Sequence, residues 1–228
     1  MVIAAVAAVI GAMAGDQERV SEMWISARLD GDGLAVTEVI DYDFGYQQRH
    51  GIYRTIPDLL TGAPITVSSP TAPDDVRIQQ RIADTEIRVG DPSKTTWQRH
   101  RYQVDFTLDR RDVVVGSLFS WNAVGTEWTV DMANVRVVLS LDTPPTGVQC
   151  QRGHPWDSRP CAVDVAPSGL IEVELDELSA GDAVTISATV GGATPALSSA
   201  ARSTPRGWTT FAWCPRARCA RWCWRPPA

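Results

Sequence analysis

Apolar and polar side chains alternate through most of this chain in short runs, which Gly, Pro and Asp clusters separate. A period of two is typical of strands with one buried face and one solvated face. In residues 23–30 and 34–44 the alternation places Met23, Ile25, Ala27 and Leu29 on one face, and likewise Leu34, Val36, Ile40, Tyr42 and Phe44. The DGDG segment between them, residues 30–33, supplies glycines that tolerate positive φ. We therefore predict an antiparallel hairpin.

Eight further segments show the same alternation: residues 65–68, 86–89, 101–108, 112–116, 128–132, 135–141, 171–175 and 184–190. One short helix is expected within residues 70–83, and little other helix outside the N-terminal segment. The pattern predicts an all-β protein, an antiparallel β-sandwich of roughly ten strands. A closed barrel would show the same alternation, but the uneven strand lengths and long connections favour the sandwich.

The N-terminal segment is apolar without interruption over residues 2–14, and this run is shorter than the roughly 20 residues that span a bilayer. It ends in Ala12-Met13-Ala14, which has the A-x-A form of a cleavage site. We interpret residues 1–14 as a signal peptide, which makes residues 22–190 an extracytoplasmic domain. The alternative is that this run forms a buried segment of the fold.

The C-terminal segment, residues 191–228, differs from the rest because it contains six Arg and four Trp but no acid. Its three cysteines, Cys214, Cys219 and Cys223, fall short of a tetrahedral zinc site. One hypothesis is that the segment is frameshifted and replaces a membrane anchor; the other is that it is a basic tail that binds lipid. The remaining chain carries 15 basic and 27 acidic groups, and this acidity argues against nucleic acid as a partner.

Two other cysteines enclose the ten-residue loop of CQRGHPWDSRPC, residues 150–161. In a secreted protein a disulfide between Cys150 and Cys161 is the expected state. A metal site would need His154 and Asp157 beside both thiolates, and the cysteine spacing fits no tight zinc pair. Free thiols are the remaining alternative, which an oxidising compartment also disfavours. We therefore predict a disulfide, no metal site and no cofactor. Trp156 in this loop either contacts a partner or packs over the base of the loop.

Two other motifs offer candidate binding residues. In GIYRTIP, residues 51–57, we expect Tyr53 and Ile56 to anchor in the core. Arg54 either pairs with Asp41, Asp43 or Asp91, or binds an anionic group through its guanidinium. In residues 121–128, Trp121, Asn122 and Trp128 either form a sugar-stacking platform with a polar handle or pack into the core. The DGDG carboxylates lack the further ligands of a calcium loop.

Several blocks together resemble the extracytoplasmic N-terminal domain of the bacterial domain-of-unknown-function 2207 family of predicted membrane proteins. In chain order they are Ala35 or Val36 to Glu38, Gly51–Pro57, Ile87–Asp91, Tyr102–Phe106, Trp121–Trp128 and Cys150 with Cys161. The resemblance covers about residues 22–190. It implies a signal peptide, an extracytoplasmic β-domain and then transmembrane helices, but it implies no reaction. The chain departs from this pattern after residue 190, where no run of 18 apolar residues occurs.

We therefore expect a non-catalytic domain that binds or scaffolds a component of the bacterial cell envelope, associated with the cell membrane. Its partner would be an envelope component or a membrane protein. The competing class is a cell-wall polymer hydrolase that uses carboxylates such as Glu38 and Asp43, which requires a suitable separation and a raised pKa on one of them. A third possibility is a secreted domain with a basic lipid-binding tail.

Overall fold

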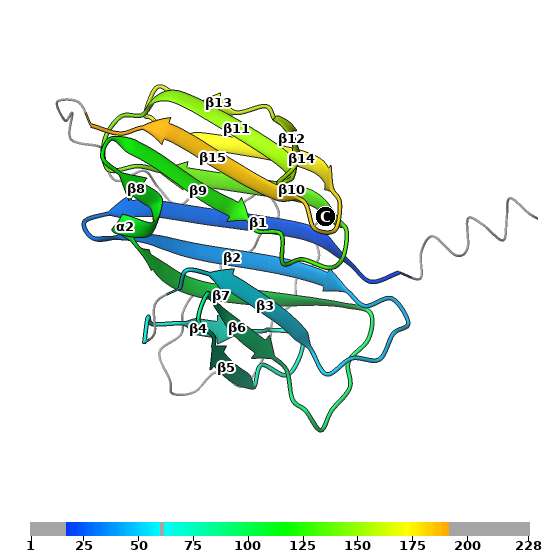
Figure 1. The fold of residues 1–228 in the computed structure, drawn as a ribbon. Helices are drawn as coiled ribbons and strands as arrows, with labels where there is room; N and C mark the ends of the chain where they lie inside the picture. The colour runs from blue at the N-terminus through cyan, green and yellow to red at the C-terminus, as the bar shows by residue number, and fades with distance from the viewer. Residues whose placement is uncertain (1–16, 60–61, 192–228) are drawn as a thin grey trace, which may run out of the picture. The chain divides into compact units, whose positions relative to one another are not determined.

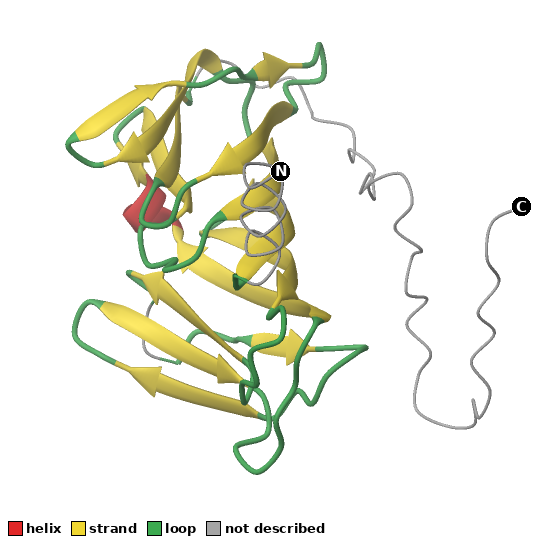
Figure 2. Cartoon of the chain, turned by 90° about the vertical axis from the view of Figure 1, so that its right-hand side faces the viewer, coloured by secondary structure: helices red, strands yellow, loops and turns green. Residues whose placement is uncertain are grey.

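A computed structural model describes residues 17–59 and 62–191 of the chain. The predicted signal peptide lies outside these residues, and so does the predicted tail apart from residue 191. Almost all regular structure in the described part is strand, and the exception is a short helix, which is drawn red in Figure 2. The prediction of an all-β protein is confirmed.

The strands form three sheets (Figure 1). The large sheet has the order β13 (Asp164–Val165), β14 (Ile171–Leu178), β10 (Met132–Ser140), β1 (Arg19–Asp30), β2 (Gly33–Asp43), β7 (Arg99–Asp109) and β4 (Thr66–Ser68). The five-stranded sheet has the order β12 (Asp157–Pro160), β11 (Thr146–His154), β15 (Ala183–Thr189), β9 (Leu118–Val124) and β8 (Val114–Val115). The three-stranded sheet has the order β3 (Ile52–Pro57), β6 (Asp84–Val89) and β5 (Val76–Gln80).

The predicted hairpin is present as β1 and β2, which pair in antiparallel register from Asp30 opposite Gly33 onward. The other named strand pairs are also antiparallel, with the exception of β1 and β10, which run parallel. Figure 1 shows the five-stranded sheet at the top and the three-stranded sheet at the bottom, with β1 and β2 running between them.

Apolar side chains from all three sheets meet in one core, as expected for a sandwich. All nine side chains predicted to face inward on β1 and β2 and the residues just after them are buried. The same alternation also places position 38, between Val36 and Ile40, on the inward face. This residue is Glu38, and it is buried. A charged group thus stands in the core-facing row of the large sheet.

Three local predictions are wrong. Residues 70–83 hold the edge strand β5 instead of a short helix, because Val76–Gln80 pair with β6. The strand expected over residues 112–116 begins with the helical turn α2 (Arg110–Val113), since the Asp109 side chain accepts a hydrogen bond from the backbone N–H of Arg111 and caps it. In the strand expected over 128–132, only Met132 is in a strand.

Candidate functional site

A cavity of about 130 Å³ lies where β3 and β9 approach each other over β2 and β7 of the large sheet. Its walls combine buried charged groups, apolar side chains and exposed polar groups. The lining residues are Glu38, Arg54, Ile56, Pro57, Asp58, Phe106, Leu108, Asp112, Val113, Ser120, Trp121, Asn122, Ala123 and Gly125. The cavity therefore joins all three sheets and the helical turn α2.

The buried wall of this cavity contains an ion pair between Arg54 on β3 and Glu38 on β2. The Arg54 Nε donates to Glu38 Oε2 at 2.7 Å, and Nη2 donates to Oε1 at 2.6 Å. A third hydrogen bond runs from Arg54 Nη1 to the backbone carbonyl of Thr55. Only 4% of the Arg54 side chain and 1% of the Glu38 side chain are exposed. Such a bidentate pair has the geometry that guanidinium and carboxylate favour.

The surroundings of Arg54 favour its protonated, charged form. Burial by itself lowers the pKa of a guanidinium, but the nearby Glu38 carboxylate outweighs burial, and Glu127 adds to its effect, so the pKa of Arg54 lies above its ordinary value. The Arg54 Cζ also lies 5.5 Å from the centre of the Trp128 ring, in cation–π range. The loop that carries Trp128 is held by a backbone hydrogen bond from Gly181 N–H to the Trp128 carbonyl.

Two further carboxylates line the cavity. Asp58 follows β3 directly and has a positive φ of 56°. Asp112 belongs to α2 and is exposed to solvent. Partial burial, then the charges of Asp109 and Asp58, raise the pKa of Asp112 above its ordinary value. Within the described residues neither Asp58 nor Asp112 has a side-chain hydrogen bond or ion pair.

The tryptophans of the 121–128 motif are both buried, with 6% of Trp121 and 5% of Trp128 exposed. Their rings belong to the core and offer no open stacking platform. Asn122 alternates with Trp121 along β9 and is exposed, and its side-chain oxygen accepts a hydrogen bond from the Thr185 hydroxyl at 2.7 Å. Trp121 and Asn122 line the cavity, and Trp128 contacts Arg54.

The structure brings Arg54, Trp121, Asn122 and Trp128 together but leaves two candidates elsewhere. Tyr53 is 61% exposed, so the prediction that it anchors in the core is wrong. The reason is strand alternation, because Ile52, Arg54 and Ile56 take the inward face of β3. Trp156 is 86% exposed at the turn between β11 and β12, where its ring lies 5.0 Å from that of His154.

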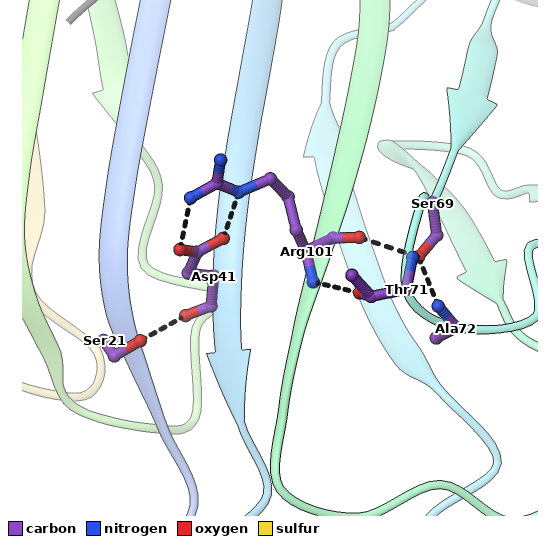
Figure 3. Close-up of polar contacts among 6 residues, drawn as sticks. All are labelled: Ser21, Asp41, Ser69, Thr71, Ala72 and Arg101. Carbon is purple, nitrogen blue, oxygen red and sulfur yellow. Dashed lines mark hydrogen bonds and ion pairs between the residues drawn. The ribbon is translucent and has the colours of Figure 1, made fainter. Parts of the chain in front are cut away.

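The predicted partners of Arg54 are also wrong, because each pairs with a different cation. Asp41 lies on the outer face of β2 and accepts two hydrogen bonds of 2.6 Å from Arg101 (Figure 3). Asp43 pairs with Arg99 and Asp91 pairs with Lys94. Figure 3 also shows that residues 69–72 are fixed to β7 through hydrogen bonds to the backbone of Arg101.

The Cys150–Cys161 disulfide is present, as predicted. It links β11 to the residue after β12, and the two cysteines also share a backbone hydrogen bond of 3.0 Å. The hairpin that presents Trp156 is thereby closed at its base. Across residues 17–59 and 62–191, no three His, Cys, Asp or Glu side chains gather in a way that could hold a metal ion.

A comparison with protein-family models matches residues 19–190 to the family described as "Predicted membrane protein (DUF2207) N-terminal domain". No curated protein sequence matches the chain. In the part of the chain that the structure describes, no helix is long and apolar enough to cross a membrane.

Several solved structures are similar to parts of the chain at low sequence identity. A two-domain M1 zinc metallopeptidase E323A mutant bound to L-tryptophan shares 9% identity, with a TM-score of 0.41, over 74% of this chain and 42% of the other. Native leukotriene A4 hydrolase from Saccharomyces cerevisiae shares 8% identity, with a TM-score of 0.45, over 75% of this chain and 29% of the other. The chain thus spans less than half the length of these structures, and likeness at this level carries no argument about function.

Proposed function

Since the family model matches residues 19–190, this chain belongs to the DUF2207 family of predicted membrane proteins, and we propose that the domain is a non-catalytic binding or scaffolding module on the extracytoplasmic side of the cell membrane. The observation that supports the proposal is the cavity between β3 and β9, which charged, polar and apolar side chains line. Its partner would be an envelope component or a membrane protein.

The disulfide supports the extracytoplasmic location. Disulfides persist in oxidising compartments and are rare in proteins that stay in the cytosol. The Cys150–Cys161 bond closes a short hairpin at the surface and links no catalytic groups. Its role is therefore that of a structural staple, which suits a domain outside the cytoplasm.

The arrangement of Glu38 favours binding over hydrolysis. Both carboxylate oxygens of Glu38 accept hydrogen bonds from Arg54, which leaves the group committed to a structural pair. Asp43, the other carboxylate of the hydrolase hypothesis, lies five positions along β2, roughly 17 Å away at strand spacing. An odd separation also places the two side chains on opposite faces of the strand. Paired carboxylates in glycosidases are separated by about 5 to 9.5 Å, so these two do not fit that geometry.

Site-specific photo-crosslinking in intact cells tests the proposal. Ser120 lines the cavity from β9 and is exposed, so a photoreactive residue there would face a bound partner. Glu174 is exposed on β14 of the large sheet, away from the cavity, and serves as the matched control position. We expect an adduct with an envelope component from position 120 and none from position 174. Adducts from neither position, or equally from both, would contradict a binding role for this cavity.

One observation favours hydrolysis as a second candidate function. Asp58 and Asp112 line the same cavity, and the pKa of Asp112 is raised, as the acid of a carboxylate pair requires. Incubation of the purified protein with isolated cell-wall material distinguishes the two functions. Release of soluble fragments that is lost in Asp112→Asn would support the hydrolase, whereas a binding module releases none.

We propose that residues 192–228, which lie outside the described part, determine how the protein attaches to the membrane. We propose that the full-length protein is tethered there by an anchor that the present tail replaces. The other candidate is the Arg- and Trp-containing tail itself, acting on anionic lipid. Resequencing from the codon for Gly191 onward, with mass spectrometry of the native protein, separates them. A 20-residue apolar helix in another reading frame would support the anchor, and a confirmed tail would support the lipid-binding form.

A further inference from the structure

The cavity between β3 and β9 has an excess of negative charge. Its charged lining residues are Glu38, Asp58, Asp112 and Arg54, three acids and one base, for a net of −2. Arg54 is already neutralised by Glu38 in the buried wall. The carboxylates of Asp58 and Asp112 are exposed at this site and have no side-chain hydrogen bond or ion pair within the described residues, although the charge of Arg111 acts on Asp112.

The size of the cavity limits what can enter it. Its volume of about 130 Å³ is close to that of an apolar protein cavity of about 150 Å³ that accommodates benzene. Drug-sized ligands occupy about 300–1,000 Å³. A single guanidinium or alkylammonium group therefore fits, whereas a sugar chain or a folded peptide segment does not fit inside.

The uncharged part of the lining suits the alkyl stem of such a group. Ile56, Phe106, Leu108 and Val113 contribute apolar side chains to the lining that also holds the buried ion pair and the two aspartates. Long cationic side chains commonly lay their methylene groups along apolar surface while their charged head meets polar partners. The cavity supplies both kinds of contact to one side chain.

We propose that this cavity binds one protonated guanidinium or alkylammonium group, with Asp58 and Asp112 as its charge partners and the apolar wall around its stem. This inference names the ligand chemistry of the binding role proposed above and rests on it. The cationic group belongs either to a protein partner, as an Arg or Lys side chain, or to a free small molecule. Bound cation would offset the repulsion between the two carboxylates.

Isothermal titration of the full-length protein with butylguanidinium tests the proposal, with neutral pentanamide as the matched ligand. The cavity variant is Asp58→Asn with Asp112→Asn. Asn suits position 58 because it tolerates the positive φ of that residue. The control variant, Asp164→Asn with Asp176→Asn, removes the same charge from exposed positions on β13 and β14. Circular dichroism verifies that both variants fold.

We expect the wild type and the control variant to bind butylguanidinium. The cavity variant should bind it at least about tenfold more weakly, because charge-assisted hydrogen bonds are lost. Pentanamide should not bind. Equal binding by all three proteins, or no binding by the wild type, would overturn the proposal. Because crosslinking at position 120 does not depend on ligand charge, an adduct there without cation binding would leave the binding role intact and reject only the cationic ligand.

A second titration identifies the source of the cation. The capped tripeptide acetyl-Gly-Arg-Gly-amide presents the same head group on a peptide backbone. Binding tighter than that of butylguanidinium would assign the site to an Arg side chain of a protein partner. Binding of butylguanidinium alone would assign it to a free small molecule. Either result supports the cationic site.

Discussion

Arg54 on β3 and Glu38 on β2 form the most deeply buried of the ion pairs observed in residues 17–59 and 62–191. The pair joins the three-stranded sheet to the large sheet through two hydrogen bonds of 2.7 and 2.6 Å. Taking both charges out of water is costly, and their attraction offsets that cost only because the geometry is bidentate. The two residues therefore depend on each other, and removal of either one leaves an uncompensated buried charge.

Arg54→Ala should lower the free energy of unfolding by about 3–5 kcal/mol, because Glu38 would remain buried without a partner. Urea unfolding followed by circular dichroism measures the change. The matched control is the double variant Arg54→Met with Glu38→Leu, which removes both charges and keeps apolar volume. Its stability should lie much closer to wild type than that of Arg54→Ala. A single variant as stable as the wild type would show that the pair is not closed in solution.

The two classes of tryptophan should respond differently to truncation. Trp121 is 6% exposed in the core, so Trp121→Ala should cost about 3–5 kcal/mol of stability. Trp156 is 86% exposed on its hairpin, so Trp156→Ala should change stability by less than about 0.5 kcal/mol. Urea midpoints of the two variants, measured side by side, check this. Similar losses in both would mean that Trp156 packs against another part of the protein.

The disulfide should contribute measurably to stability. Closing the ten-residue loop between Cys150 and Cys161 should stabilise the fold by about 3 kcal/mol in the chain-entropy model. Cys150→Ala with Cys161→Ala should lower the urea midpoint accordingly, and dithiothreitol should have no further effect on the midpoint of that variant. Non-reducing peptide mapping of the wild type should recover the two cysteines in one linked peptide. Recovery of both as alkylated thiols would refute the pairing.

Alternation along the chain predicted the strands β1, β2, β7, β10, β14 and β15 and their buried faces, but it did not predict β5, β9 or β11. The alternation also bears on the environment of Arg54 and Tyr53. Glu38 falls at an inward position of β2, which is the signal that a buried cation must face it. The same rule places Tyr53 on the outer face of β3. Ile52 and Ile56 take the inward face, and Tyr53 lies an odd number of positions from both. Both the partner of Arg54 and the exposure of Tyr53 were thus within reach of the sequence.

Apart from the β1–β2 hairpin, which its turn residues predict, strand pairing was not predictable in this way, because a period of two defines the faces of a strand but not its neighbours. The parallel pairing of β1 with β10 and the division into three sheets have no counterpart in the pattern. The cavity could not be predicted for the same reason, since its walls come from β2, β3, β7, β9 and α2.

Glycines in two of the family-like blocks have a structural purpose that only the fold reveals. Gly51 and Gly90 have positive φ values of 117° and 142°. A Cβ on Gly51 would lie 1.8 Å from the Val89 carbonyl oxygen, and one on Gly90 would lie 2.0 Å from the His50 carbonyl oxygen. These two segments therefore pass each other at a distance that only glycine permits. The sequence shows both glycines but not that they meet.

The pH dependence of stability should differ in sign between two neighbouring aspartates. The raised pKa of Asp112 means that its charged form is disfavoured in the folded state, so it opposes folding above that pKa and has no effect well below the ordinary value of 3.8. Asp112→Asn should therefore raise the free energy of unfolding at pH 7 and leave it unchanged well below pH 3.8. Urea unfolding at a series of pH values measures this difference.

Asp109 provides the matched comparison, since hydrogen bonds from the Arg111 side chain and backbone lower its pKa from 3.8 to about 2. Its stabilising effect should be complete above 3.8 and disappear as the pH falls through about 2. Asp109→Asn retains a capping side chain but loses the charge, so it should lower stability at pH 7, opposite to Asp112→Asn. If both variants shifted stability in the same direction at pH 7, the assigned environment of one of these carboxylates would be wrong.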